Sequence, residues 1–175
     1  WGIIIGVGVL IFHILEIFTM IFLYLKYPQY KWISFNDMKG MDRETFAELL
    51  RESCLAVWID KIAGFGTFPI ESAKSGVPVI ALIPEIIPEF ANEKSAIWTN
   101  DLLSIPDLIG NYVRLWLEDS VPTELIEGSK ELSKLYSEEE GKKEIEKTYR
   151  ELVNERRNEF GIFLNTNREI AQSLI

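Results

Sequence analysis

Apolar and polar residues follow a pattern that switches repeatedly between strand-like and helix-like periods from Tyr30 onward. Short apolar runs rich in β-branched or aromatic residues predict buried strands, and apolar residues three or four positions apart predict helices. The predicted strands are YKWISF (30–35), CLAVWID (54–60), VPVIALI (77–83) and AIWTN (96–100). Strands that alternate with helices form a parallel sheet covered on both faces. The predicted fold class is therefore α/β, a Rossmann-like doubly wound parallel sheet.

The helices between these strands carry start and stop signals. Asp42 is placed to cap one helix, Gly76 to end the short helix of PIESAKSG, and Ser104 to open another. Two of these helices carry an apolar face. It consists of Phe46, Leu49 and Leu50 in the first helix and of Leu108, Ile109, Tyr112, Val113 and Trp116 in the third.

The first 25 residues allow two interpretations. Between Gly2 and Leu25 the clearly polar residues are His13, Glu16 and Thr19, so the segment is long and apolar enough to cross a bilayer. The other interpretation is a strand, GIIIGVGVL, followed by a helix that stops at Pro28. We favour strand plus helix, because the rest of the chain requires an opening βα unit. That helix lacks a polar outer face, which indicates a covering partner, a missing domain, a membrane surface or a segment that is not native to this fold.

The C-terminal part is more strongly charged. Ser137 and Glu140 have the spacing of a capping box, and an apolar stripe follows at Ile145, Tyr149, Leu152 and Val153. These signals predict an amphipathic helix with a solvated charged face. We accordingly divide the chain into an apolar opening segment (1–27), a Rossmann-like domain with closing amphipathic helices (28–160) and a C-terminal tail (161–175).

The amino-acid composition excludes several classes of function. The formal charge of −9 argues against nonspecific binding of nucleic acid, and 47% hydrophobic residues support one sizeable core. The single cysteine, Cys54, excludes an internal disulfide and fits a reducing compartment; it lies in an apolar run, which favours a structural thiol. With His13 as the one histidine, we expect neither a His-rich metal site nor a Ser-His-Asp triad. We expect the protein in the cytoplasm or at the cytoplasmic face of the membrane.

The stretch GFGTFPIESAKSG, Gly64 to Gly76, has the order expected of an anion-binding turn. A parallel strand that runs into glycines and then a helix leaves main-chain N–H groups at the ligand-binding edge of the sheet. The amides near Thr67 and Phe68 are the expected donors, and Glu71, one turn later, suits the hydroxyls of a ribose. An ordinary tight turn followed by a solvated glutamate explains the same spacing equally well.

The same residues, with Pro88-Glu89 and AIWTND after them, resemble a known family. It is the C-terminal, nucleotide-sugar-binding domain of retaining glycosyltransferases of the two-Rossmann-domain GT-B type, group 1 or family 4. The resemblance is specific over Cys54 to Asp101 and looser from Tyr30 to Phe160. It implies transfer of a hexose from a UDP- or GDP-sugar to an acceptor glycan or glycolipid, in bacterial polysaccharide or glycolipid synthesis, with no cofactor or metal.

The resemblance also assigns site residues. Gly64, Phe65, Gly66 and Thr67 match the loop whose amides hold the donor diphosphate, and Glu71 matches the second Glu of the family's Glu-x7-Glu motif, which holds the ribose. The first Glu of that motif falls at Ala63, which accepts no hydrogen bond through its side chain. Selection of the donor sugar is then altered, lost or moved to Asp60 or Lys61.

The rest of the family's catalytic machinery has no counterpart here. The basic pair that neutralises the leaving diphosphate has no match before Lys26, and no catalytic residue is identified. The acceptor is expected to bind to an N-terminal domain that these 175 residues do not include. Two functions therefore stay open: the donor half of a glycosyltransferase, inactive as an isolated chain, and a noncatalytic nucleotide-sugar-binding or interaction module, with a membrane surface as a further partner of either.

Overall fold

The computed structural model describes residues 2–6, 10–37, 40–62, 66–92 and 94–173. For residues 2–6, 10–16, 37, 164, 170, 171 and 173 we describe the main chain alone. The chain divides into two compact units, Trp1–Leu135 and Tyr136–Ile175, and each is described by itself.

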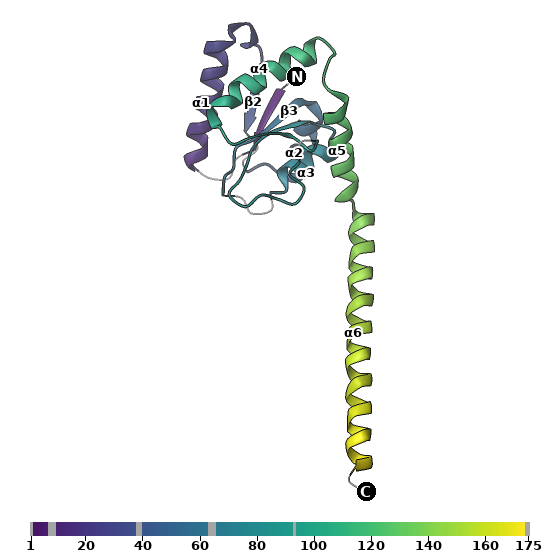
Figure 1. Cartoon of the computed structure of the whole chain (residues 1–175). Coiled ribbons are helices and arrows are strands. Elements are labelled where there is room, and N and C mark those ends of the chain that lie inside the picture. The colour runs from purple at the N-terminus through teal and green to yellow at the C-terminus, as the bar shows by residue number, and fades with distance from the viewer. Residues whose placement is uncertain (1, 7–9, 38–39, 63–65, 93, 174–175) are drawn as a thin grey trace. The chain divides into compact units, whose positions relative to one another are not determined.

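The first unit is built on a five-stranded parallel sheet (Figure 1) with the order β2-β1-β3-β4-β5. The chain moves outward from β1 to β2, returns to β3 on the other side of β1, and continues to β5. This doubly wound order confirms the predicted Rossmann-like class. The strands are β1 (Gly2–Gly6), β2 (Ser34–Asp37), β3 (Ser53–Trp58), β4 (Val79–Leu82) and β5 (Ile97–Thr99).

Helices cover both faces of the sheet. The elements are α1 (Leu10–Lys26), η1 (Pro28–Tyr30), α2 (Arg43–Glu52), α3 (Phe68–Lys74), η2 (Leu102–Ser104), α4 (Ile105–Leu117), α5 (Thr123–Leu135) and α6 (Glu138–Ser173). Side chains of β3 point alternately to the two faces: Leu55 and Val57 pack with α1 and α4, whereas Ala56 and Trp58 contribute to the opposite layer. α5 begins beside α4 and then packs on α3.

The opening segment forms the strand and helix that the sequence analysis favoured. β1 pairs with both β2 and β3, which places it inside the sheet. None of the helices in the described part of the chain meets the length and hydropathy needed to span a bilayer. The outer face of α1 is apolar, as expected, with exposed side chains at Ile17, Phe18, Ile21, Phe22 and Leu25.

Most predicted strand boundaries agree with the structure to within a few residues, whereas β2 begins later than predicted. Pro28 starts a 3-10 turn and the Ile33 N–H donates to the Tyr30 carbonyl at 3.0 Å, so β2 begins at Ser34 instead of Tyr30. Asp42 caps α2 as predicted, since its carboxylate accepts from the Thr45 and Glu44 N–H groups at 3.0 Å. The hydrogen bonds from Thr45 hold the pKa of Asp42 below its ordinary value.

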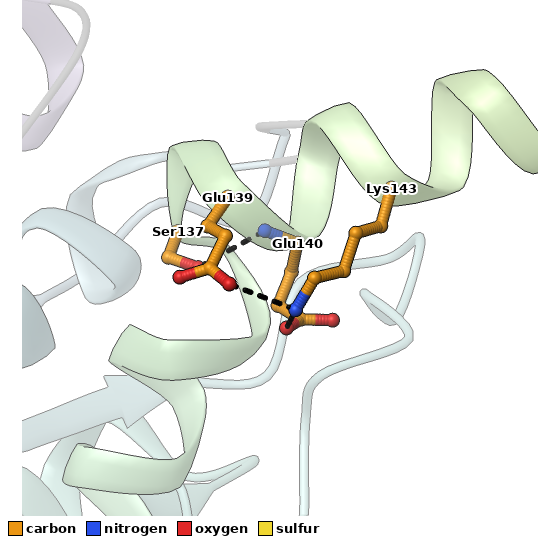
Figure 2. Close-up of polar contacts among 4 residues, drawn as sticks. All are labelled: Ser137, Glu139, Glu140 and Lys143. Atoms are coloured by element: carbon orange, nitrogen blue, oxygen red, sulfur yellow. Dashed lines mark hydrogen bonds and ion pairs between the residues drawn. The ribbon is translucent and has the colours of Figure 1, made fainter.

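The second unit consists mainly of α6, whose first turn contains the predicted cap (Figure 2). The Glu140 N–H donates to Ser137 Oγ at 3.3 Å. Lys143 then bridges Glu139 and Glu140 at 2.9 and 2.8 Å, which joins the acidic first turn to the next one. α6 continues to Ser173, so it runs through most of residues 161–175.

Candidate functional site

The candidate site lies at the carboxyl ends of the central strands. In a doubly wound sheet, ligands bind where the strand order reverses, here between β1 and β3. Residues 7–9 and 63–65 follow these two strands, and they lie outside the described residues. Ala63, Gly64 and Phe65 are therefore predicted site residues whose placement the structure does not describe.

Two features of the structure require glycine at position 66, the conformation of its main chain and the packing of a neighbouring side chain. Its φ of +65° lies in the left-handed region that favours glycine. A Cβ at this position would stand 2.4 Å from the ring of Trp58, which is buried at the end of β3. Besides its predicted place in a diphosphate-binding loop, Gly66 thus meets a second requirement in the structure, the packing of Trp58.

Thr67 and Glu71 lie on consecutive turns at the start of α3. The Glu71 N–H donates to the Thr67 carbonyl at 2.9 Å, so the two residues are one turn apart, as predicted. Both side chains are exposed, and among the described residues neither the Thr67 hydroxyl nor the Glu71 carboxylate has a partner. Since α3 has seven residues and Pro69 near its start has no N–H, the helix itself adds little to anion binding.

Close packing of α3 fixes the main chain of Glu71. Ser72 and Ala73 are buried beneath it, and Ser72 Oγ donates to the Phe68 carbonyl at 2.9 Å. Gly76 ends the helix at φ +74°, which confirms it as the stop signal, and the Val77 N–H returns to the Ser72 carbonyl at 2.9 Å. The carboxylate therefore projects from a well-packed element and not from a free loop.

The next residues of the β3 loop contribute Asp60 and Lys61. Asp60 Oδ1 accepts from the Ile62 N–H at 2.9 Å, and the Lys61 carbonyl accepts from the Glu85 N–H at 2.9 Å. The second bond joins the loop after β3 to the loop after β4. Lys61 is exposed, so its ammonium group is a cation available at this edge of the sheet.

The described residues offer neither a reactive thiol nor a metal site. Cys54 is half-buried, and desolvation raises the pKa of its thiol, which fits a structural role. Across the described ranges, no three His, Cys, Asp or Glu residues are grouped as a metal site would require.

An apolar cavity of about 650 Å³ was missed by the sequence analysis. It lies between the β5 side of the sheet and helices α4 and α5. Its described lining residues fall between Ile83 and Leu125 and do not include Glu71. Among the described residues that line it, Glu124 alone carries a charge, so the cavity does not suit a diphosphate. The sequence feature that could have indicated it is the pair of apolar residues Ile86-Ile87 in a loop. Ile87 lines the cavity and is exposed.

Comparison with known proteins gives information on the fold of this chain and not on its activity. No protein family matches the chain, and no curated protein matches it. A chain in the crystal structure of the GtfA/B complex is similar in structure, with a TM-score of 0.54 and 12% sequence identity. The similarity covers 78% of this chain and 33% of the other, so the present chain spans about a third of that chain's length. At this identity the match shows a shared fold.

Proposed function

We propose that this chain is the donor-binding half of a retaining glycosyltransferase of the GT-B type. It would bind a UDP- or GDP-sugar, whose hexose is transferred to a glycan or glycolipid acceptor held by another domain. The reaction belongs to bacterial polysaccharide or glycolipid synthesis, in the cytoplasm or at the cytoplasmic membrane face. Two findings support the class: the doubly wound sheet, and its similarity to part of a glycosyltransferase complex.

The observation that carries the proposal is the carboxylate of Glu71, which is exposed beside Gly66 and has no partner among the described residues. A ribose presents two adjacent hydroxyls, and a carboxylate can accept a hydrogen bond from each. The packed helix α3 fixes the main chain that carries this carboxylate before the ligand arrives, so no ordering of the main chain is needed there on binding.

The diphosphate of the donor would then lie over Gly66 and Thr67. The Thr67 hydroxyl and the main-chain N–H groups of this turn would donate to its oxygens, and Lys61 would supply a positive charge. As the bond from the sugar to the diphosphate breaks, negative charge grows on the leaving oxygen, and these donors stabilise it. Ala63 leaves the donor sugar without the family's carboxylate partner.

A noncatalytic nucleotide-sugar-binding module is the second candidate. It is favoured by Ala63 and by the absence of Lys or Arg before Lys26. Such a module binds the nucleotide through Glu71 but does not accelerate departure of the diphosphate.

Calorimetry with UDP, GDP and their hexose conjugates tests nucleotide binding directly. We expect the chain to bind one nucleotide, and Glu71→Ala to weaken binding by about 1.5–3 kcal/mol, the range for hydrogen bonds to a charged group. Glu127→Ala, which removes an exposed carboxylate from α5, is the matched control and should leave affinity unchanged. Equal affinities for wild type and Glu71→Ala would refute the ribose assignment.

A turnover assay separates the two candidates. The isolated chain is expected to release nucleoside diphosphate slowly at most, because no positioned acceptor provides the advantage of proximity. Binding that discriminates among sugars favours the transferase half, and binding that ignores the sugar favours the module. Robust acceptor-dependent glycoside formation by this chain alone would contradict the half-enzyme proposal.

A further inference from the structure

α6 carries a stripe of large apolar side chains that are exposed. Its members are 56–72% exposed and recur at intervals that place them on one side of the helix. They are Ile145, Tyr149, Leu152, Phe160 and Phe163.

Many charged side chains in the N-terminal half of α6 pair with one another. They form ion pairs three or four residues apart, so each pair closes within the helix itself. The pairs are Lys142–Glu138, Lys143–Glu139, Lys147–Glu144 and Arg150–Glu146, at 2.7–3.8 Å. At 100° per residue, the members of the last three pairs lie away from the apolar stripe.

The area of the stripe is sufficient for an interface between two helices. The three aromatic side chains of the stripe carry up to about 150–250 Å² each, so at these exposures, and with Ile145 and Leu152 added, two stripes would bury on the order of 1,000 Å² together. That value reaches the size at which a specific protein interface becomes plausible. A 36-residue helix with one such stripe matches the geometry of a coiled-coil strand.

Two charged residues interrupt the stripe near its centre. Arg156 and Glu159 have opposite charge and lie 3.2 Å apart at Nη1 and Oε2 on the same helix. In a parallel pair of helices, each would face its own copy, and like charges would repel. In an antiparallel pair centred between them, each Arg156 faces the Glu159 of the other copy, and Leu152 faces Phe163.

We propose that two copies of this chain associate through α6 as an antiparallel helical pair with this register. The apolar stripe supplies the contact area, and the reciprocal contacts between Arg156 and Glu159 select the orientation. The proposal is independent of nucleotide binding, because α6 contains none of the residues proposed to bind the donor.

Charge exchange provides the test, with sedimentation equilibrium of the full chain over a concentration series. Wild type is expected to dimerise. R156E alone and E159R alone should each raise the dimer dissociation constant at least about tenfold, because each creates two like-charge contacts across the interface. An equimolar mixture of the R156E and E159R chains should regain wild-type affinity, since both cross-chain contacts are then of opposite charge.

R150E is the matched control, because it breaks an equivalent ion pair within α6 on a face away from the stripe. It should leave dimerisation unchanged, and circular dichroism should show that all variants keep their helix content. A wild-type chain that is monomeric at every concentration would overturn the proposal. So would single variants that dimerise as wild type does, or an R150E chain as weak as R156E.

Discussion

Two helices of this protein, α4 and α6, have the same sequence periodicity and different surroundings. The apolar face of α4 is buried against the sheet, with Ile105, Ile109, Tyr112 and Val113 each no more than 3% exposed. The apolar stripe of α6 is exposed along its described length. Periodicity therefore identifies an apolar helix face, but it does not identify what covers that face.

Glycines in the two helices show the same difference. A Cβ added at Gly110 of α4 would come within 2.6 Å of the Tyr27 ring, whereas at Gly141 and Gly161 of α6 it would meet no atom within 4 Å. Tyr27 is held over Gly110 by its hydroxyl, which donates to Asp107 at 2.8 Å. Close packing thus disfavours a side chain at Gly110 of α4, whereas Gly141 and Gly161 of α6 are replaceable.

Truncating a large side chain should give the largest contrast between the two helices. Ile109→Ala removes a fully buried side chain and should lower the free energy of unfolding by about 2–5 kcal/mol. Leu152→Ala on α6 should change it by less than about 0.5 kcal/mol at concentrations where the chain is monomeric. Urea unfolding of both variants measures the contrast, and similar losses would show that α6 is covered within one chain.

Replacing Gly110 of α4 and Gly141 of α6 by alanine should give smaller effects on stability, and the two effects should have opposite signs. Alanine gains about 0.5–1 kcal/mol of helix propensity over glycine at either position. At Gly110 the contact with Tyr27 should outweigh this gain, for a net loss of about 1–3 kcal/mol, whereas Gly141→Ala should increase helicity. Thermal unfolding followed by circular dichroism reports both. A stabilised Gly110→Ala protein would be inconsistent with close packing of Tyr27.

The polar contact between α1 and α4 should have the smallest effect. Asp107 accepts from Lys26 Nζ at 2.6 Å and from Tyr27, and these bonds lower the pKa of Asp107. The pair is exposed, so Asp107→Asn should lower Tm by only about 1–3 °C at neutral pH.

The pH dependence of this contact follows from the direction of the pKa shifts. A lowered Asp107 pKa contributes stability above the carboxylate's unfolded pKa, and that stability is lost as pH falls through the folded value. Lys26 has a raised pKa, so its contribution is lost only as pH rises through that value, in the alkaline range. The Tm difference between wild type and Asp107→Asn should therefore shrink below about pH 4. A difference that persists in acid would assign the effect to packing.

Local signals predicted much of the fold because they act over a few residues. The side chains of Asp42 and Ser137 accept hydrogen bonds from main-chain N–H groups two or three residues later, and the Gly76 N–H donates to the Ala73 carbonyl. The continuous apolar run CLAVWID likewise predicted a buried strand, which the structure confirms with Leu55, Ala56 and Val57 fully buried. Such interactions depend little on the rest of the chain.

Long-range contacts were not predictable in this way. Neither the packing of Trp58 on Gly66 nor that of Tyr27 on Gly110 has a signature in sequence spacing, because each joins separate elements. The apolar cavity likewise depends on how α4 and α5 meet the β5 side of the sheet. At the candidate site, spacing predicted that Thr67 and Glu71 lie one turn apart, and their role as nucleotide ligands stays a prediction.

The most direct test of the central claim compares a nucleoside diphosphate with its 2′-deoxy analogue in wild type and Glu71→Ala. If Glu71 accepts the ribose hydroxyls, loss of the 2′-hydroxyl should weaken wild-type binding about five- to tenfold, equivalent to about 1–1.4 kcal/mol, and should have little effect on the variant. Calorimetry on the four combinations gives the coupling energy. A 2′-hydroxyl effect of the same size in both proteins would contradict the assignment of Glu71 to the ribose.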